Sequence, residues 1–80
     1  MHELGILRQL VGVVRKTADK NRIRVIKFIT LEVGDESGIV PYYMKKLFPV
    51  AVDAVPLLKN AELRIRMVCG RGLVIRDIGY

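Results

Sequence analysis

The sequence predicts an α+β fold of two layers, in which a three-stranded sheet carries two helices on one face in the order α-β-α-β-β. A helix-period stripe of apolar residues opens the chain, and two later segments alternate apolar and polar residues as strands do. A proline-headed apolar segment separates those two segments. Packing both helices on one face of the sheet would bury all of these stripes at once. With 80 residues, the chain is expected to be a single small domain spanning residues 1–80.

The first element is predicted to be an amphipathic helix from Leu4 to Lys20. Its apolar residues recur every three or four positions, at Leu4, Leu7, Leu10, Val11 and Val14. Charged residues take the other side, at Arg8, Arg15, Lys16 and Asp19. This pattern predicts one buried stripe and one solvated face.

Residues 22–33 are predicted to form the first strand. Apolar residues share one parity, at Ile23, Val25, Ile29, Leu31 and Val33, and only Lys27 interrupts it. Ile26 and Phe28 make the opposite face partly apolar, and a partner or a dimer edge could cover them. Residues 34–38, Gly-Asp-Glu-Ser-Gly, are typical of a turn whose glycines supply positive φ angles.

A second helix is predicted to begin at Pro41, because proline is favoured at the first position of a helix. Pro49 lies further along the same apolar segment. Proline interrupts helical hydrogen bonding, so a kink or an end is expected near Phe48. Another turn is expected at Pro56 and Lys59.

The last two strands are predicted on either side of a short link. Leu63, Ile65 and Met67 alternate with charged residues, and Met67 is expected in the core. Residues 69–72, Cys-Gly-Arg-Gly, lead directly into residues 73–78. A glycine-containing link of this length predicts an antiparallel hairpin.

Charge and cysteine content limit the classes of partner and compartment. Fourteen Lys and Arg against eight Asp and Glu give a net charge of +6, which is compatible with nucleic acid or an anionic protein surface. Cys69 is the single cysteine, so this chain alone cannot form an internal disulfide or a CxxC zinc site, and a reducing cytoplasm is expected. Arg8 interrupts the first apolar run, which argues against a signal peptide or a membrane span.

Few side chains could carry catalytic chemistry. His2 is the only histidine, so no Ser/His/Asp or Cys/His triad can be assembled and the chain is not expected to be an enzyme. Asp35 and Glu36 lie in a turn, where carboxylates are usually solvated or cap a helix. Arginines at strand positions could line the open face of the sheet, at Arg22, Arg24, Arg64, Arg66 and Arg76. With Phe28 the best ring available to stack on bases, a solvated face is favoured over nucleic acid binding.

The N-terminal residues Met1-His2-Glu3 place an imidazole one residue after a free α-amine. The amine, an amide nitrogen that can lose its proton and a neutral imidazole are joined through one dipeptide, and they can close two small chelate rings around a divalent metal. A planar, nitrogen-rich donor set favours Ni(II) or Cu(II). A histidine at position 2 is more often simply solvated, so the rest of the chain decides between these interpretations.

The same tripeptide opens a series of landmarks along residues 1–68. They are Met1-His2-Glu3-Leu4 before an amphipathic helix, the segment 33–41 (Val-Gly-Asp-Glu-Ser-Gly-Ile-Val-Pro), Phe48, and Ala61-Glu62-Leu63. In their order and approximate spacing these landmarks resemble the HypA/HybF family of nickel metallochaperones. The resemblance implies a HypA-like nickel-binding domain over residues 1–80.

The chain departs from the family pattern after Val68. Family members have a second part, a zinc domain with two CxxC pairs inserted before the last strand. Here residues 69–72 pass directly into the last strand, as if the zinc domain had been removed near residues 68–72. Cys69 is then a remnant of a first zinc ligand or an incidental cysteine, and no zinc is expected.

The resemblance implies a non-enzymatic carrier that delivers Ni(II) as cargo during maturation of a nickel enzyme, usually [NiFe] hydrogenase and in some relatives urease. It places the metal at Met1, His2 and Glu3, with Glu3 contributing its amide nitrogen or a carboxylate that orients the site. It also implies two partners, a nickel-loading GTPase and the large subunit of the nickel enzyme. Neither a membrane nor nucleic acid is expected as a partner, and a homodimer is left open.

Two other functions remain open at this point. One is a zinc-less paralogue that has become an interaction module for an acidic protein, with the strand arginines as its contact surface. The other is a small basic nucleic-acid-binding domain, whose affinity would fall steeply with salt.

Overall fold

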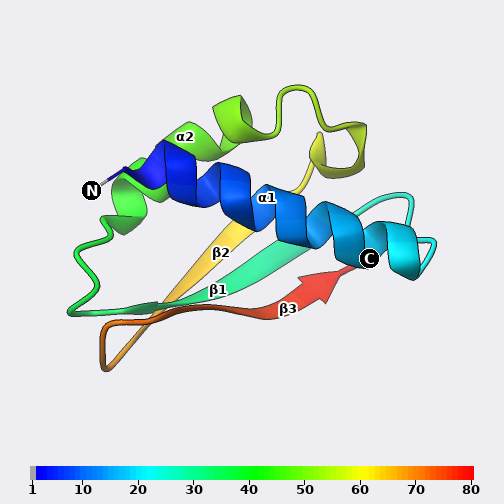
Figure 1. Ribbon diagram of the computed structural model, residues 1–80. Helices are drawn as coiled ribbons and strands as arrows, with labels where there is room; N and C mark the ends of the chain where they lie inside the picture. Colours follow the sequence, from blue (N-terminus) through cyan, green and yellow to red (C-terminus); the bar gives the residue numbers. More distant parts are fainter. Residues whose placement is uncertain (1) are drawn as a thin grey trace.

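A computed structural model describes residues 2–80 and contains a three-stranded mixed sheet with both helices on one face (Figure 1). The elements are α1 (Glu3–Lys20), β1 (Phe28–Gly34), α2 (Pro41–Ala51), the short 3-10 helix η1 (Pro56–Leu58), β2 (Glu62–Val68) and β3 (Leu73–Gly79). The predicted α+β class, the order α-β-α-β-β and the two-layer arrangement are confirmed.

The strands lie in the order β2-β1-β3, with β1 parallel to β2 and antiparallel to β3. The predicted hairpin between the last two strands is therefore wrong, because β1 lies between them. The chain passes from β1 through α2 to β2, and a crossover of this kind makes the two strands parallel. Residues 69–72 then carry the chain across the end of β1 to its other side, where β3 begins.

The link between β2 and β3 is bonded to the turn that follows β1. The backbone N–H groups of Asp35 and Glu36 donate to the carbonyl oxygens of Val68 and Gly70, each at 2.8 Å. Asp35 Oδ1 accepts a hydrogen bond from the Gly70 N–H at 3.1 Å. A Cβ atom on Gly34 would lie 2.3 Å from the Gly70 carbonyl oxygen, so only glycine fits there. Asp35 therefore has a structural role in this turn.

The core lies between the helices and the sheet. Its largest fully buried side chains are Leu7, Val14, Ile26, Ile29, Leu31, Val33, Met44 and Leu58. The predicted α1 stripe and the predicted face of β1 both contribute to it. Met67, expected in the core, is 48% exposed, because it lies near the end of an edge strand that has a neighbour on one side only.

The first strand begins at Phe28 rather than at residue 22, because α1 ends in a Schellman motif. The Ile23 N–H donates to the Ala18 carbonyl at 2.9 Å, and the Arg22 N–H donates to the Asp19 carbonyl at 3.3 Å. Arg22 has φ 57°, a left-handed conformation that turns the chain away from strand geometry.

This turn changes which side chains of the segment are buried. Val25 was expected on the buried face but is 62% exposed, whereas Ile26 was expected on the opposite face but is buried. Arg22 and Arg24 precede β1 and do not belong to the sheet, which corrects their predicted place on its open face.

The second helix begins at Pro41 as predicted and ends at Ala51, three residues beyond the expected end near Phe48. Pro49 is exposed in its last turn, where a missing N–H costs only one helical hydrogen bond. Among residues 2–80, neither helix is long and apolar enough to cross a membrane.

Candidate metal site

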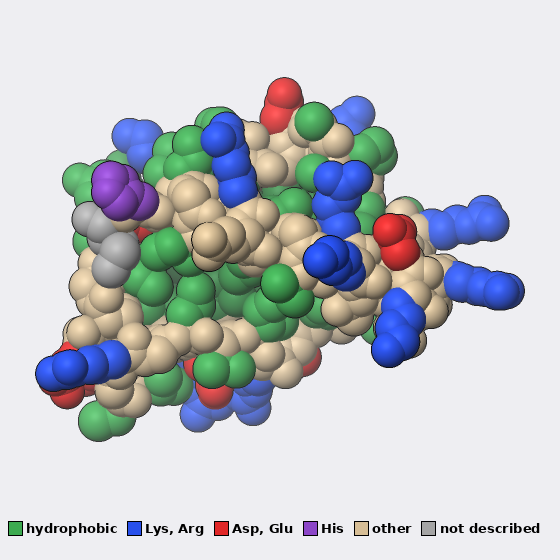
Figure 2. All heavy atoms as spheres, in the orientation of Figure 1, with side chains coloured by type: hydrophobic (Ala, Val, Ile, Leu, Met, Phe, Trp, Pro, Cys, Tyr) green, Lys and Arg blue, Asp and Glu red, His purple; other side chains and the backbone are tan. Residues whose placement is uncertain are grey.

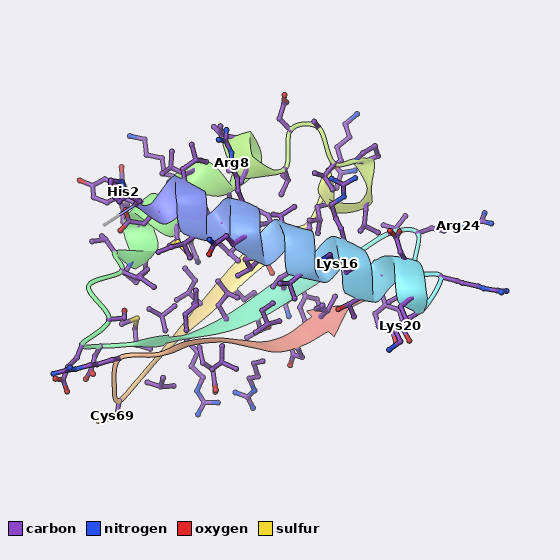
Figure 3. The ribbon with its side chains drawn as sticks, in the orientation of Figure 1. His2, Arg8, Lys16, Lys20, Arg24 and Cys69 are labelled. Carbon is purple, nitrogen blue, oxygen red and sulfur yellow. The ribbon has the colours of Figure 1, made fainter. Side chains whose placement is uncertain are left out.

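The candidate metal site lies at the start of α1. Met1 lies outside the described residues, while His2 is the N-cap of α1 and Glu3 is its first residue. The His2 side chain is exposed at one end of the molecule (Figures 2 and 3). Its imidazole is therefore accessible to an arriving metal ion.

At this corner, some backbone polar groups form hydrogen bonds of the helix and others do not. The His2 carbonyl oxygen accepts the helical hydrogen bond from the Ile6 N–H at 3.1 Å. The N–H of Glu3, as the first residue of the helix, has no backbone acceptor within α1 and instead interacts with its own carboxylate, which helps to lower the pKa of that carboxyl. Losing this amide proton on metal binding would therefore break no hydrogen bond of the helix.

The Glu3 side chain holds the corner against the second helix. It is only 6% exposed, and its Oε2 atom accepts a hydrogen bond from the backbone N–H of Val40 at 3.2 Å. Val40 is the N-cap of α2. This hydrogen bond lowers the pKa of the Glu3 carboxyl group, although burial acts in the opposite direction. The carboxylate thus joins the starts of the two helices.

A metal site built from side chains alone has no candidate in residues 2–80. No three His, Cys, Asp or Glu side chains in this range are grouped so that they could hold a metal ion. Cys69 is exposed in the link between β2 and β3, apart from His2 (Figure 3). Chemistry at the N-terminal corner would therefore depend on backbone nitrogens together with the imidazole.

The open face of the sheet offers less to nucleic acid than its arginines suggest. The Arg64 guanidinium lies over the Phe28 ring, 3.9 Å from its centroid, and pairs with Glu62. Arg76 pairs with Glu32 at 3.7 Å. One side of the Phe28 ring is thus covered, and carboxylates partly neutralise two of the arginines. These contacts favour a solvated face over one that stacks bases.

Comparison with known proteins gives the family of this fold. A family model described as "Hydrogenase/urease nickel incorporation, metallochaperone, hypA" matches residues 1–73. The chain belongs to the HypA family. The match includes the N-terminal corner, both helices and the strands β1 and β2. HypA is described as a metallochaperone family, in agreement with the expectation that the chain is not an enzyme.

Curated HypA relatives are similar along most of the chain. The hydrogenase maturation factor HypA of Geobacter metallireducens is 39% identical over 72 residues, and that of Trichodesmium erythraeum is 38% identical over 72 residues. Each alignment covers 90% of this chain but only 62% and 60% of the two relatives. The chain thus spans about three fifths of the length of these HypA relatives.

A solved HypA structure has the same fold. The solution structure of the Ni metallochaperone HypA from Helicobacter pylori matches with a TM-score of 0.79 at 18% identity, covering 96% of this chain and 72% of that one. A coverage of 96% leaves about three of the 80 residues unaligned, whereas seven follow Leu73, where the family match ends. The structural similarity to HypA therefore extends into β3.

Proposed function

We propose that this chain binds Ni(II) as cargo through Met1, His2 and Glu3 and delivers it during maturation of a nickel enzyme such as [NiFe] hydrogenase. The observation that carries the proposal is the exposed His2 imidazole on a corner that the Glu3–Val40 hydrogen bond ties to α2. A carrier has to release its metal, and an exposed site exchanges metal more readily than an enclosed one.

The three residues have different roles in this proposal. Met1 supplies the α-amine, and His2 supplies its amide nitrogen and its imidazole. Glu3 supplies its amide nitrogen, whose N–H has no backbone acceptor within α1, while its carboxylate positions the corner through Val40. Four nitrogen donors in this arrangement suit planar Ni(II).

The names of the relatives support the assignment and suggest partners. The two bacterial relatives are named hydrogenase maturation factors, and the solved structure is named a Ni metallochaperone. We propose a nickel-loading GTPase and the large subunit of the nickel enzyme as partners, in the cytoplasm. A four-residue link at residues 69–72 joins β2 to β3, so we propose that no zinc domain is inserted between these two strands.

Nickel calorimetry on untagged protein tests the proposal, with mass spectrometry confirming that the chain starts at Met1. The exposed Cys69 thiol could bind nickel independently, so all variants carry Cys69→Ser. We expect one Ni(II) per chain with a planar-nickel absorbance band, and loss of both in His2→Ala and in N-terminally acetylated protein. Glu36→Gln, in an exposed turn, is the control and should bind as the parent does. Equal nickel uptake by the parent and His2→Ala would overturn the proposal.

A further inference from the structure

A groove runs along the molecule between α1 and the edge strand β3. Figure 2 shows apolar atoms in this hollow, beneath α1. Its first part has a volume of about 190 Å³ and is lined by Ile6, Gln9, Leu10, Val13, Leu73 and Ile75. Its second part, of about 360 Å³, continues from Ile75 past Ile78 to Tyr80.

The groove is open because β3 has a neighbour on one side only. β3 pairs with β1, and its other edge has no strand beside it in residues 2–80. Leu73, Ile75 and Ile78 face the helix layer but are only partly buried. On α1, Val13 is 55% exposed beside them. An apolar trough next to unpaired strand edges matches the shape and hydrogen-bonding groups of one more extended strand.

The charges around the groove favour an acidic occupant. Residues 8–27, which include most of α1, contain seven Lys and Arg and one Asp, a net +6, although Arg8 and Arg24 point away from the groove (Figure 3). Lys16 and Lys20 follow Val13 at helical spacing on the groove side of α1, and both are exposed (Figure 3). Neither lysine forms an ion pair with another described residue. Arg76 and Asp77 border the second part of the groove, but Arg76 is already paired with Glu32.

We propose that this groove binds an extended segment of a partner protein, rich in apolar and acidic residues, as a fourth strand on β3. Its backbone pairs with the free edge of β3, and every second side chain fills the trough between α1 and β3. Acidic side chains lie beside Lys16 and Lys20. A second copy of this chain fits poorly, because each copy would bring its own cations to the same rim. Of the proposed nickel site, the described residues His2 and Glu3 do not line the groove.

Fluorescence anisotropy with a designed peptide tests this inference. The probe is a dye-labelled, end-blocked nine-residue peptide in which Glu and Val alternate. One comparison peptide has Lys in place of Glu, and another has Pro in place of the two central Val, which prevents strand pairing. We expect saturable binding of the Glu–Val peptide and at least about fivefold weaker binding of both comparison peptides.

Two matched pairs of variants locate the binding site. Val13→Glu adds a charge in the groove, and Val74→Glu adds the same charge on the other face of β3, at a valine that is 56% exposed. Lys16→Glu/Lys20→Glu reverses the charge on the rim of the groove. Lys45→Glu/Lys46→Glu makes the same change of charge on exposed residues of α2. In each pair, the variant in or beside the groove should bind the peptide at least about fivefold more weakly than the control variant. Because all of these side chains are exposed, circular dichroism should show the variants to be folded.

Several results would overturn the inference. They are equal effects within a pair of variants, equal binding of the proline peptide, and no saturable binding of the Glu–Val peptide. A dimer in sedimentation that Val13→Glu abolishes and Val74→Glu preserves would assign the groove to a second copy instead. Displacement of the peptide by a single-stranded oligonucleotide, with the same dependence on Val13, would assign it to nucleic acid. Nickel uptake by Val13→Glu should equal that of the parent. A negative result in the peptide experiments would therefore not contradict the proposed nickel site.

Discussion

Glu3 Oε2 accepts a hydrogen bond from the backbone N–H of Val40 at 3.2 Å, which links the first residue of α1 to the N-cap of α2. The two residues are 37 positions apart in the chain. This contact makes the orientation of the N-terminal corner depend on tertiary structure. It also separates the Glu3 carboxylate, which positions the corner, from the nitrogens proposed to bind nickel.

The hydrogen bond predicts a specific dependence of stability on pH. The pKa of Glu3 is lowered in the folded chain, so its ionised form stabilises the fold above the pKa of an unfolded glutamate, about 4.3. This contribution is lost as the pH falls through the lowered folded-state pKa. Glu3→Gln should therefore lower the urea midpoint at neutral pH, and the difference from wild type should vanish in acid. A loss no larger than that of Glu36→Gln, or one that grows in acid, would contradict this.

Glu3 and His2 should differ in their effect on nickel affinity. Glu3→Gln keeps the amide nitrogen and removes only a carboxylate that positions the corner, so we expect about a tenfold loss of affinity at most. His2→Ala removes a donor and should lose more than about a hundredfold. For the parent protein, affinity should fall as the pH is lowered, because amine, amide and imidazole must all lose protons to bind. Calorimetry at several pH values measures both effects, and a pH-independent affinity would rule out the nitrogen chelate.

Arg22 should gain stability when replaced by glycine. It has φ 57° at the end of α1, a conformation that costs a residue with a side chain more than it costs glycine. We expect Arg22→Gly to raise the free energy of unfolding by about 0.5 to 1 kcal/mol in urea titrations. Arg24→Gly, two residues later and without a positive φ, should give no such gain. If both variants changed the free energy of unfolding equally, the cause would be the loss of a positive charge rather than the backbone conformation at Arg22.

Gly34 should tolerate no side chain. An added Cβ would lie 2.3 Å from the Gly70 carbonyl oxygen, which is backbone and cannot move away independently. Gly34→Ala should therefore reduce the free energy of unfolding by about 2 to 3 kcal/mol. Gly72→Ala is the matched control, because no atom lies within 4 Å of a Cβ there, and it should change stability by less than about 0.5 kcal/mol. Thermal unfolding of the two variants tests this difference.

Periodicity predicted the parts of the fold that depend on local pattern. The α1 stripe around Leu7 and Val14 and the β1 face of Ile29 and Leu31 are buried as expected, because their spacing matches a helix and a strand. Pro41 marked the start of α2 for an equally local reason, its fixed φ. The first helix was predicted to begin at Leu4 and begins one residue earlier, at Glu3, so that His2 is its N-cap.

Features that depend on distant partners were missed. The alternation at residues 22–33 predicted one long strand, but the Schellman motif around Arg22 ends α1 with backbone bonds that no side-chain pattern reports. The short link at residues 69–72 suggested a hairpin, because its bonding to Asp35 and Glu36 is visible only once β1 lies between the strands. Nothing in the sequence predicted the Glu3–Val40 contact except the presence of a carboxylate at the start of a helix.

The strand order β2-β1-β3 has a further consequence for how the chain folds. Every cross-strand pair joins residues at least 34 positions apart, so no local hairpin is available to nucleate the sheet. High contact order of this kind slows folding, since a large loop has to close before the contacts form. The helices can form from local contacts, whereas both pairings of the sheet depend on β1 meeting strands that are distant in the sequence. In a newly made chain, β1 therefore has no strand partner until β2 has been synthesised, and its second edge stays unpaired until β3 follows.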